Sequence, residues 1–296
     1  WEDKRMFLAE RKIIMSMANL KHKIKDHFLS KEIFSLELDR KTEILRTRPK
    51  PTLANLPKYY DSKKYLSHQK RGETLLSKIY FIVKKRMLFF KTRMIAKLFY
   101  NPGKALDVGS GTGDFLLALK NKGWDVVGVE PAELAKKEAS KLGLRHIKAI
   151  KNCESQDFDL VTFWHSLEHV YDLKETLAST AATLKKGGHL IIACPNYKSW
   201  DAKHYKNNWA AWDVPRHLRH FSPKSLSAVL EPMGLEQTKV RPLLLDSFYI
   251  SILSEKIKGS AAPFLKGFVF GMISNLSGLF YNNYSSQIYI FRKKSN

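Results

Sequence analysis

The sequence predicts an α/β protein built on a mostly parallel sheet of seven strands, with helices on both faces of the sheet. At 296 residues the chain is long enough to bury a full core. Between residues 104 and 194, apolar strand patterns alternate with helical patterns, which is typical of a parallel sheet covered by helices. A glycine-rich turn joins the first of these strands to the first helix. We therefore expect a ligand site at the carboxyl ends of the strands.

The expected elements follow one another in a simple order. A basic amphipathic helix over residues 75–98 precedes the sheet, because apolar residues recur there at helical spacing with Lys and Arg between them. Ser222 and Pro223 provide a helix N-cap and a first-turn proline. Strands are expected at 104–109, 125–130, 145–150, 158–165, 188–194, 235–245 and 286–293, and helices at 113–122, 131–142, 172–185 and 223–233.

The turn after the first strand is the most informative segment. Its glycines permit positive φ angles and a close approach of the backbone to a ligand. Dinucleotide sites need G-x-G-x-x-G, whereas the third glycine here arrives one residue early, which disfavours pyrophosphate binding. The segment resembles motif I of the class I S-adenosylmethionine (SAM) methyltransferases. The resemblance implies that SAM contacts Asp107, Gly109, Ser110, Gly111 and Gly113.

A second candidate contact is Glu130, which ends the next strand 17 residues after Gly113. A carboxylate at this position can accept hydrogen bonds from both ribose hydroxyls of the cofactor. The alternative is a surface glutamate before Pro131 that interacts favourably with the start of a helix. The segment at 149–154 lacks the Asp that often binds adenine in such proteins, so the adenine contact stays unassigned.

Three further segments extend the resemblance over residues 100–245. The segment 158–170, with Leu-Glu-His-Val at its end, is similar to the fourth-strand region of ubiquinone-biosynthesis O-methyltransferases, and 186–196 to their fifth strand. The segment 212–222 resembles a substrate-loop signature of a bacterial subgroup. The resemblance implies a Rossmann-like class I methyltransferase fold with a closing antiparallel strand pair, SAM as cofactor, and His165 beside SAM.

The candidate catalytic residues are His169 and His217. Six of the ten histidines lie between 165 and 220, after the fourth and fifth strands. If the methyl acceptor is a hydroxyl, it must lose a proton, and an imidazole with a pKa near neutrality suits that task. His169 is expected to face the acceptor, and His217 in a later loop is the alternative candidate for the general base. The alternative for each is a structural hydrogen bond.

No metal is expected, because methyl transfer from a sulfonium is an in-line displacement that requires alignment more than a Lewis acid. Asp213 with His217 and His220, or Glu168 with His169, has donor types for a divalent ion, but a hydrogen-bonded loop is favoured. The two cysteines, Cys153 and Cys194, are too few for a disulfide framework or a four-cysteine zinc site.

Charge widens the list of functions. The net charge is +23, and residues 1–100 alone hold 25 Lys and Arg against 10 Asp and Glu. Such a surplus indicates an anionic partner or surface, or simply a solvated basic face. We expect a methyltransferase that acts on a small or lipid-like organic acceptor, at oxygen. An RNA methyltransferase and a SAM-binding protein without catalysis are the alternatives, and nucleic acid is not the favoured partner.

The expected organisation has three parts. Residues 1–66 form an N-terminal, metal-free extension, 67–100 a basic helix that packs on the catalytic domain, and 101–296 that domain with a helical insertion at about 246–282. Within the insertion, 264–280 is apolar, but its length and Lys266 argue against a membrane span. An amphipathic helix is favoured, which packs on the domain, covers the substrate entrance or touches a membrane interface. No targeting segment is found, so a cytoplasmic location is expected, and the oligomeric state is open.

Overall fold

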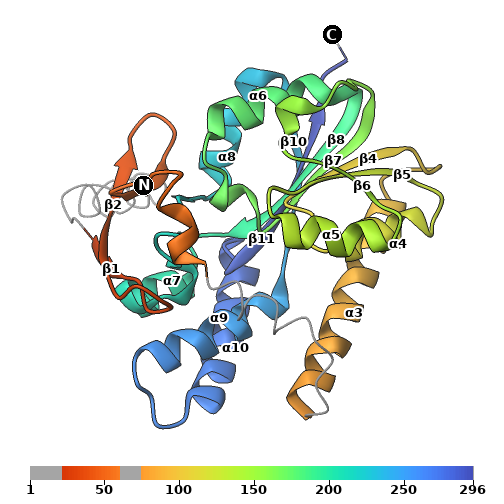
Figure 1. Cartoon of the computed structure of the whole chain (residues 1–296). Helices are drawn as coiled ribbons and strands as arrows, with labels where there is room; N and C mark the ends of the chain where they lie inside the picture. Colours follow the sequence, from red (N-terminus) through yellow and green to blue (C-terminus); the bar gives the residue numbers. More distant parts are fainter. Residues whose placement is uncertain (1–21, 61–74, 296) are drawn as a thin grey trace, which may run out of the picture. The chain divides into compact units, whose positions relative to one another are not determined.

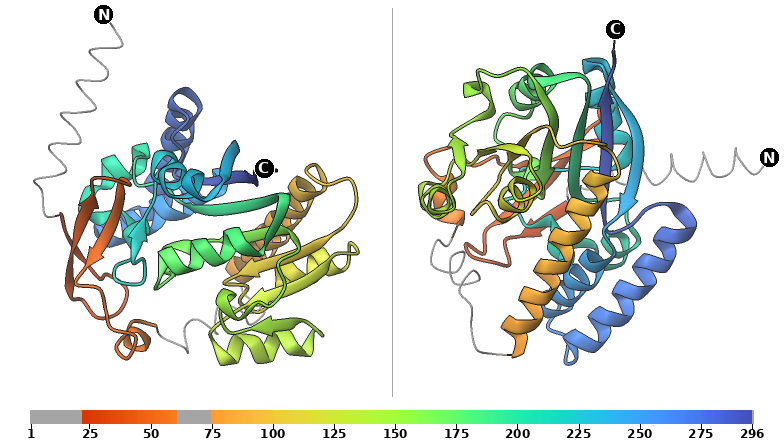
Figure 2. Two further views of the ribbon diagram at one scale, coloured as in Figure 1. Left: turned by 90° about the horizontal axis from the view of Figure 1, so that it is seen from above. Right: turned by 90° about the vertical axis from the view of Figure 1, so that its right-hand side faces the viewer.

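The computed structural model describes residues 22–60 and 75–295, with side chains from Lys23 and, in the second range, from Lys85 onward. These residues fall into two compact units. Of the described residues, the sheet unit comprises 75–194, 229–241 and 288–295, and the hairpin unit comprises 22–60, 195–228 and 242–287. Figure 1 labels the elements, and Figure 2 shows two further views of the ribbon with the same colours along the chain.

The sheet unit is organised around seven strands in the order β10-β11-β8-β7-β4-β5-β6. The pairs β4–β5, β4–β7, β5–β6 and β7–β8 are parallel. Because β4 pairs with both β5 and β7, the chain reverses its direction of travel across the sheet there, and ligands of open α/β sheets bind at such a point. The strands are β4 Lys104–Val108, β5 Asp125–Val129, β6 Arg145–Ile147, β7 Phe158–Trp164, β8 Leu184–Pro195, β10 Leu235–Pro242 and β11 Ser286–Lys293.

The strand pair at one edge of the sheet is antiparallel. The Lys294 amide donates to the Gly234 carbonyl, and the Thr238 hydroxyl donates to the Ile290 carbonyl. Gly234 therefore lies opposite Lys294, and Thr238 lies opposite Ile290, as in an antiparallel pair. This closing antiparallel pair is the one that the sequence predicts.

Helices cover both faces of the central strands. In β7 four consecutive residues, Leu160 to Phe163, are buried, and a strand can bury consecutive residues only if both of its faces are covered. The α/β fold with a mostly parallel seven-stranded sheet is therefore confirmed. The helices that lie in this unit are α3 Leu75–Ala96, α4 Asp114–Lys120, α5 Glu133–Lys141 and α6 Leu173–Thr183, and α8 Pro223–Leu230 begins in the hairpin unit and ends in this one. Short 3-10 turns are η2 Ile150–Asn152, η3 Leu167–His169 and η6 Glu231–Met233.

Two strands illustrate how the observed element boundaries differ from those that the sequence predicts. The third expected strand, 145–150, ends at Ile147 and continues into the turn η2. The fifth begins at Leu184 rather than residue 188, with an irregularity in its pairing with Phe158. Gly187 has a φ of 76°, a conformation that favours glycine, and lies within the early part of β8. The pattern of apolar residues does not indicate that the strand begins before this glycine.

The hairpin unit has its own antiparallel sheet in the order β1-β2-β3-β9. β3 pairs with β9 through Leu45 opposite His220 and Arg46 opposite Arg219. The elements are β1 His22–Lys25, β2 Ile33–Asp39, β3 Ile44–Arg48, β9 Arg219–His220, α7 Trp200–Tyr205, α9 Leu244–Ile257, α10 Pro263–Tyr281, η1 Leu56–Tyr59, η4 Lys206–Asn208 and η5 Ala210–Trp212.

One apolar core joins the distant parts of this unit. Ile24 and Phe34 from the first strands pack in the same cluster as Trp209 and Trp212, together with Ile250 of α9. The sequence predicts residues 1–66 as a separate extension, whereas the described part of that segment shares a sheet and a core with 195–228 and 242–287. A segment of fewer than about 40 residues buries too little apolar surface to fold alone, which explains why later residues complete this sheet and its core. The boundary at residue 66 lies outside the described residues.

The predicted insertion consists of two helices. α10 corresponds to the expected helix over 264–280, and α9, which the sequence does not signal clearly, precedes it. α9 and α10 pack against each other as a helical hairpin, after which the hairpin unit is named.

Candidate functional site

The glycine turn lies between β4 and α4, at the point where the sheet changes direction. Gly109, Gly111 and Gly113 have φ angles of 77°, 55° and 82°, a region that favours glycine. A Cβ on Gly109 would lie 2.4 Å from Ser166 Cβ, whereas one on Gly111 would meet no atom within 4 Å. Gly109 is therefore needed for packing, and open space lies beside Gly111 for a ligand.

Glu130 holds this turn in place. Its carboxylate is buried and accepts hydrogen bonds from the backbone amides of Gly111, at 2.9 Å, and Ala132, at 2.8 Å. It is thus not the surface residue of the alternative interpretation, although it does satisfy an amide at the start of α5. Each carboxylate oxygen has two lone pairs, so both retain capacity for a hydroxyl donor.

Asp107 is a buried acid with few compensating partners. The Thr162 hydroxyl donates to its Oδ1 at 2.6 Å. Burial raises the pKa of Asp107 to about 7, and the negative charge of Glu130 adds to this effect, while the Thr162 hydrogen bond and the positive charge of Lys91 oppose it. A positive charge bound nearby would lower this pKa and favour the ionised form.

Two buried polar atoms converge above Gly128 in β5. A Cβ there would lie 2.4 Å from His146 Nε2 and 2.6 Å from Ser110 Oγ, so only glycine leaves room for both side chains. Neither atom has a hydrogen-bond partner among the described residues. Burial lowers the pKa of His146 and favours its neutral form. A glycine inside a buried strand is the one sequence signal that points to His146, which the sequence analysis missed.

Lys91 and Trp164 also belong to the surroundings of the turn. Lys91 Nζ, from α3, lies 4.2 Å from the centre of the Trp164 ring, at the end of β7. Phe115 of α4 contacts the same ring edge-on, with ring centres 5.4 Å apart. The periodic pattern of α3 marked Lys91 only as one of several basic residues, so its position near the site could not be predicted.

His165 follows β7 directly and has a φ of 53°, which is uncommon for a residue with a side chain. Its amide donates to the Ala193 carbonyl, which fixes the backbone at the end of two parallel strands. His165 Nδ1 lies 3.6 Å from Oε1 of the buried Glu168. The structure therefore brings His165, the glycine turn and Glu130 together within the sheet unit, all at the carboxyl ends of strands.

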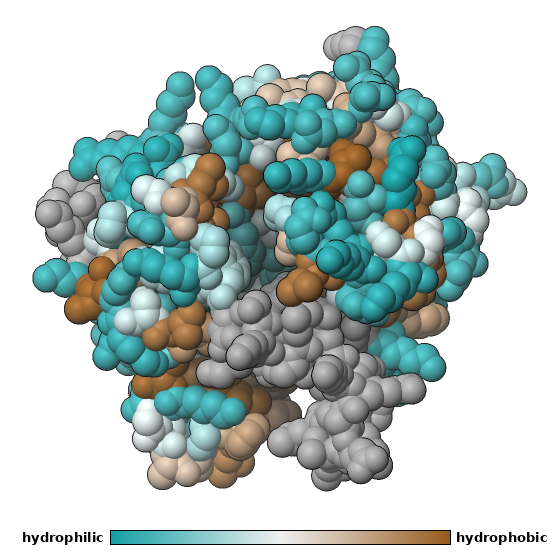
Figure 3. Space-filling model, viewed as in Figure 1, coloured by the Kyte–Doolittle hydropathy of each residue, from teal (hydrophilic) through white to brown (hydrophobic). Residues whose placement is uncertain are grey.

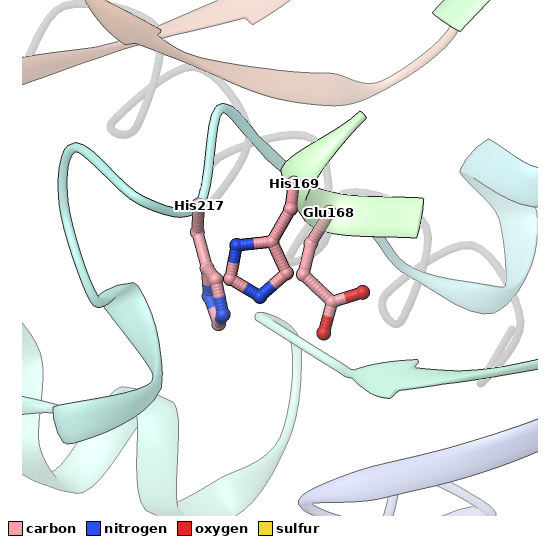
Figure 4. Close-up of side chains that lie close together, drawn as sticks. All are labelled: Glu168, His169 and His217. Atoms are coloured by element: carbon pink, nitrogen blue, oxygen red, sulfur yellow. The ribbon is translucent and has the colours of Figure 1, made fainter. Parts of the chain in front are cut away.

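His169 and His217 come from different units, and Figure 4 draws their side chains with that of Glu168. His169 ends η3, is partly buried, and donates its amide to the Ser166 carbonyl at 3.1 Å. His217 precedes β9, and its Nδ1 lies 2.8 Å from the Ala211 carbonyl oxygen. Their roles in catalysis remain predictions.

The loop that carries His217 is held by hydrogen bonds. Arg216 donates to Asp213 Oδ1 at 2.7 Å, to Asp26 Oδ1 at 2.9 Å and to the Tyr59 carbonyl at 3.1 Å. His220 Nε2 lies 3.1 Å from Thr47 Oγ1. These contacts tie the loop to Asp26, Tyr59 and Thr47 of the same unit, and the absence of a metal stays a prediction.

Comparison with known proteins identifies a family and relatives that this chain resembles. A family model described as "Methyltransferase domain" matches residues 81–240. The chain is 30% identical over 169 residues to the ubiquinone biosynthesis O-methyltransferase of Idiomarina loihiensis, covering 52% of this chain and 70% of the relative. The enzyme of the same name from Pectobacterium atrosepticum is 26% identical over 167 residues, with 52% and 69% covered.

Solved structures share the fold. A SAM-dependent methyltransferase from Thermotoga maritima, described as a possible histamine N-methyltransferase, has a TM-score of 0.50 and 22% identity, covering 73% of this chain and 94% of that one. The [4+2]-cyclase SpnF also has a TM-score of 0.50, with 16% identity and 69% and 80% covered. Since a cyclase shares the fold, structural likeness alone does not specify the reaction.

Proposed function

The chain belongs to the family of SAM-dependent methyltransferase domains, and from this membership we propose that it methylates a hydroxyl oxygen of a small or lipid-like organic acceptor. The cofactor and the reaction class follow from the family. The acceptor and the atom that is methylated are the proposal.

The residues around the glycine turn fit SAM. Open space lies beside Gly111, the buried Ser110 hydroxyl is unpaired among the described residues, and both Glu130 oxygens retain lone pairs. SAM supplies a methyl group that is already activated on a positively charged sulfur, so the protein has to align the reactants and exclude water. Glu130 would accept hydrogen bonds from the ribose hydroxyls of SAM, and Asp107 would supply a negative charge to the positively charged cofactor.

The observation that carries transfer to oxygen is the position of His169. It stands five residues after the last residue of β7, in a segment similar to that of O-methyltransferases, and at the carboxyl edge of the parallel strands. A hydroxyl is a weak nucleophile until its proton is removed, and an imidazole is suited to remove it near neutral pH. We assign His169 that role, with the oxygen–carbon bond forming as the sulfur–carbon bond breaks.

The test is turnover with methyl-labelled SAM. The purified full chain is incubated with a metabolite extract of a deletion strain of the source organism, which accumulates the unmethylated acceptor. We expect a labelled organic product one methylene heavier than its precursor, stable to acid as an ether is. A labelled amine would overturn transfer to oxygen, and a labelled carboxylate ester would overturn transfer to a hydroxyl.

Two matched variants locate the base. His169→Ala is expected to lower turnover by about 10² to 10⁴ with SAM affinity unchanged, because a base acts on the acceptor and not on the cofactor. His217→Ala is the comparison. A loss confined to His217→Ala would move the base to the loop before β9, and full activity of both variants across pH would remove histidine from proton transfer.

RNA is the second candidate acceptor, and the net charge of +23 is what favours it. Transfer of label to RNA, with binding that weakens steeply as salt rises, would replace the small-molecule proposal.

A further inference from the structure

The helix α10 exposes a continuous apolar face. The predicted apolar residues Leu265, Phe268, Met272, Leu276 and Leu279 are all exposed, between 44% and 68%. The sequence predicts an amphipathic helix that packs on the domain, covers the substrate entrance or touches a membrane interface, and the structure shows that the apolar face is exposed. The exposed apolar residues of α10 are Phe264, Leu265, Phe268, Val269, Met272, Ile273, Leu276, Leu279, Phe280 and Tyr281.

The other face of α10 is already used. A Cβ on Gly267 would lie 2.5 Å from Ile252 Cα, and one on Gly271 would lie 2.8 Å from Phe248 Cα, so α10 contacts the backbone of α9 through its glycines. The Ser274 hydroxyl donates to Asp201 at 2.8 Å on the same side. These contacts fix the rotation of α10, and its large apolar side chains cannot turn inward without breaking them.

The partner helix continues the apolar surface. Leu244, Leu245 and Tyr249 at the beginning of α9 are 48%, 45% and 66% exposed. Figure 3 shows hydrophobic atoms, in brown, on the part of the hairpin that is visible in that view. A surface of this extent on a protein marks a site of association with another molecule or with a membrane.

The charges at the tip of the hairpin indicate what that partner is. Within residues 244–281, all of which the structure describes, the exposed charged residues are Lys256, Lys258 and Lys266, and the half-buried Asp246 lies at the beginning of α9, away from the tip. The acidic residue beside them, Glu255, is buried, with Lys258 at 3.7 Å. Lys256 also lines a pocket of about 440 Å³ together with Lys25 and His27. Lysines thus border the apolar surface at one end.

We propose that the α9–α10 hairpin docks on the surface of an anionic lipid bilayer. The apolar face of α10 enters the boundary between headgroups and acyl chains, and the lysines at the tip contact anionic headgroups. The exposed Tyr249 and Tyr281 fit this arrangement, because tyrosine has a ring for the apolar region and a hydroxyl for the wet one. The inference does not depend on the identity of the methyl acceptor.

A spanning orientation fits the contacts less well. By length and composition α10 could cross a membrane, since an 18-residue window of this 19-residue helix has a mean hydropathy of 1.2, and only 22% of that window is buried. However, Ser274 is bonded to Asp201, and Asn275 Nδ2 donates to the Leu244 carbonyl at 3.0 Å. A span would expose these polar groups and the glycine face to lipid, whereas interfacial docking preserves every contact with α9. A second copy of the chain would cover the apolar face but leave the lysines without opposite charge.

The experiment is co-flotation of the full chain with vesicles of phosphatidylcholine alone or with phosphatidylglycerol added. We expect flotation with the anionic vesicles, weakened by salt. Phe268→Asp combined with Leu276→Asp is expected to reduce binding at least about tenfold, because it places charges in the apolar boundary. The matched control is Leu134→Asp with Leu142→Asp, which changes two leucines of the sheet unit that are 52% and 42% exposed. Unchanged SAM binding and thermal unfolding show that each variant is folded.

Charge reversal tests the lysines separately. Lys256→Glu with Lys266→Glu is expected to weaken binding to anionic vesicles by more than tenfold, since each lysine near such a surface contributes about fivefold. Lys122→Glu with Lys137→Glu is the control at two exposed lysines of the sheet unit. Four outcomes would overturn the proposal: no flotation with either vesicle, equal binding of the Phe268/Leu276 variant, resistance to carbonate extraction as a spanning helix shows, or a dimer in solution that this variant converts to a monomer.

Discussion

Two buried aspartates, one in each unit, have opposite electrostatic states. Burial would raise the pKa of Asp26, but hydrogen bonds from Arg216 and Ser30 and the positive charge of Arg216 hold it well below its usual range. Asp107 has a hydroxyl as its hydrogen-bond partner, and its pKa rises to about 7. The hairpin unit therefore uses its buried charge for structure. The sheet unit keeps a carboxyl that lacks full compensation, as a site for a cationic ligand does.

The largest expected effect breaks the compensated pair. Arg216→Ala leaves Asp26 buried without its guanidinium and is expected to lower the free energy of unfolding by about 3 to 5 kcal/mol. Denaturant unfolding measures it. Because the folded pKa of Asp26 lies below its unfolded value, the stability from this pair is present above about pH 4 and is lost as pH falls further. Arg48→Ala, at an exposed pair with Glu37, should cost under about 1 kcal/mol, and equal losses in both variants would contradict the structural role of Asp26.

The next effect is on the cofactor. Glu130→Ala is expected to weaken SAM binding by about 1.5 to 3 kcal/mol, the range for hydrogen bonds to a charged group, as measured by calorimetric titration. Glu133→Ala, three residues later on the exposed start of α5, is the matched control. If both variants bind SAM as the wild type does, Glu130 only supports the turn.

Asp107 makes SAM binding depend on pH. Below pH 7 the free protein must lose a proton before the carboxylate can face a cation, so SAM affinity should fall by about tenfold per pH unit there and level off above it. In Asp107→Asn this slope should disappear, while Thr162 still has an oxygen to donate to. Stability has the opposite sign: since the folded pKa exceeds the usual carboxyl value, the wild type should lose free energy of unfolding from about pH 4 to 7 relative to the variant. The same SAM slope in the variant would assign the titration to another group.

The smallest expected effect concerns Gly111. Its φ of 55° costs a residue with a Cβ about 1 to 2 kcal/mol, but no neighbouring atom would clash with that Cβ. Gly111→Ala should therefore fold with slightly reduced stability and a larger loss of SAM affinity, which thermal unfolding and titration separate. Equal affinity would show that the open space beside Gly111 is not part of the cofactor site.

The same contrast explains which parts the sequence could reveal. The glycine turn and Glu130 belong to short segments whose spacing carries the information, so their positions at the ends of neighbouring strands could be predicted, whereas their contact with SAM stays a prediction. Asp26 and Arg216 lie 190 positions apart, and no local pattern links them. His146 was missed because its signal is the absence of a side chain at Gly128.

The orientation of α10 could not be predicted for a different physical reason. The helical period separates an apolar face from a small one, and burial of the larger face is the usual outcome. In this protein the face with small residues is the buried one, because Gly267 and Gly271 let the backbones of α10 and α9 come closer than large side chains would allow. The pattern indicates two faces, and the choice between them depends on α9.

The pairing of β3 with β9 has a consequence for synthesis on the ribosome. The Thr47 hydroxyl donates to the His217 carbonyl, a contact that spans 170 positions. At a translation rate of about 5 to 20 residues per second, roughly ten to thirty seconds pass between the synthesis of β3 and that of its partner strand β9. During that interval Leu45 and Phe34, both destined for the core, lack the later half of it. The nascent chain therefore presents an open strand edge to chaperones, and a slower codon run before residue 217 would prolong that exposure.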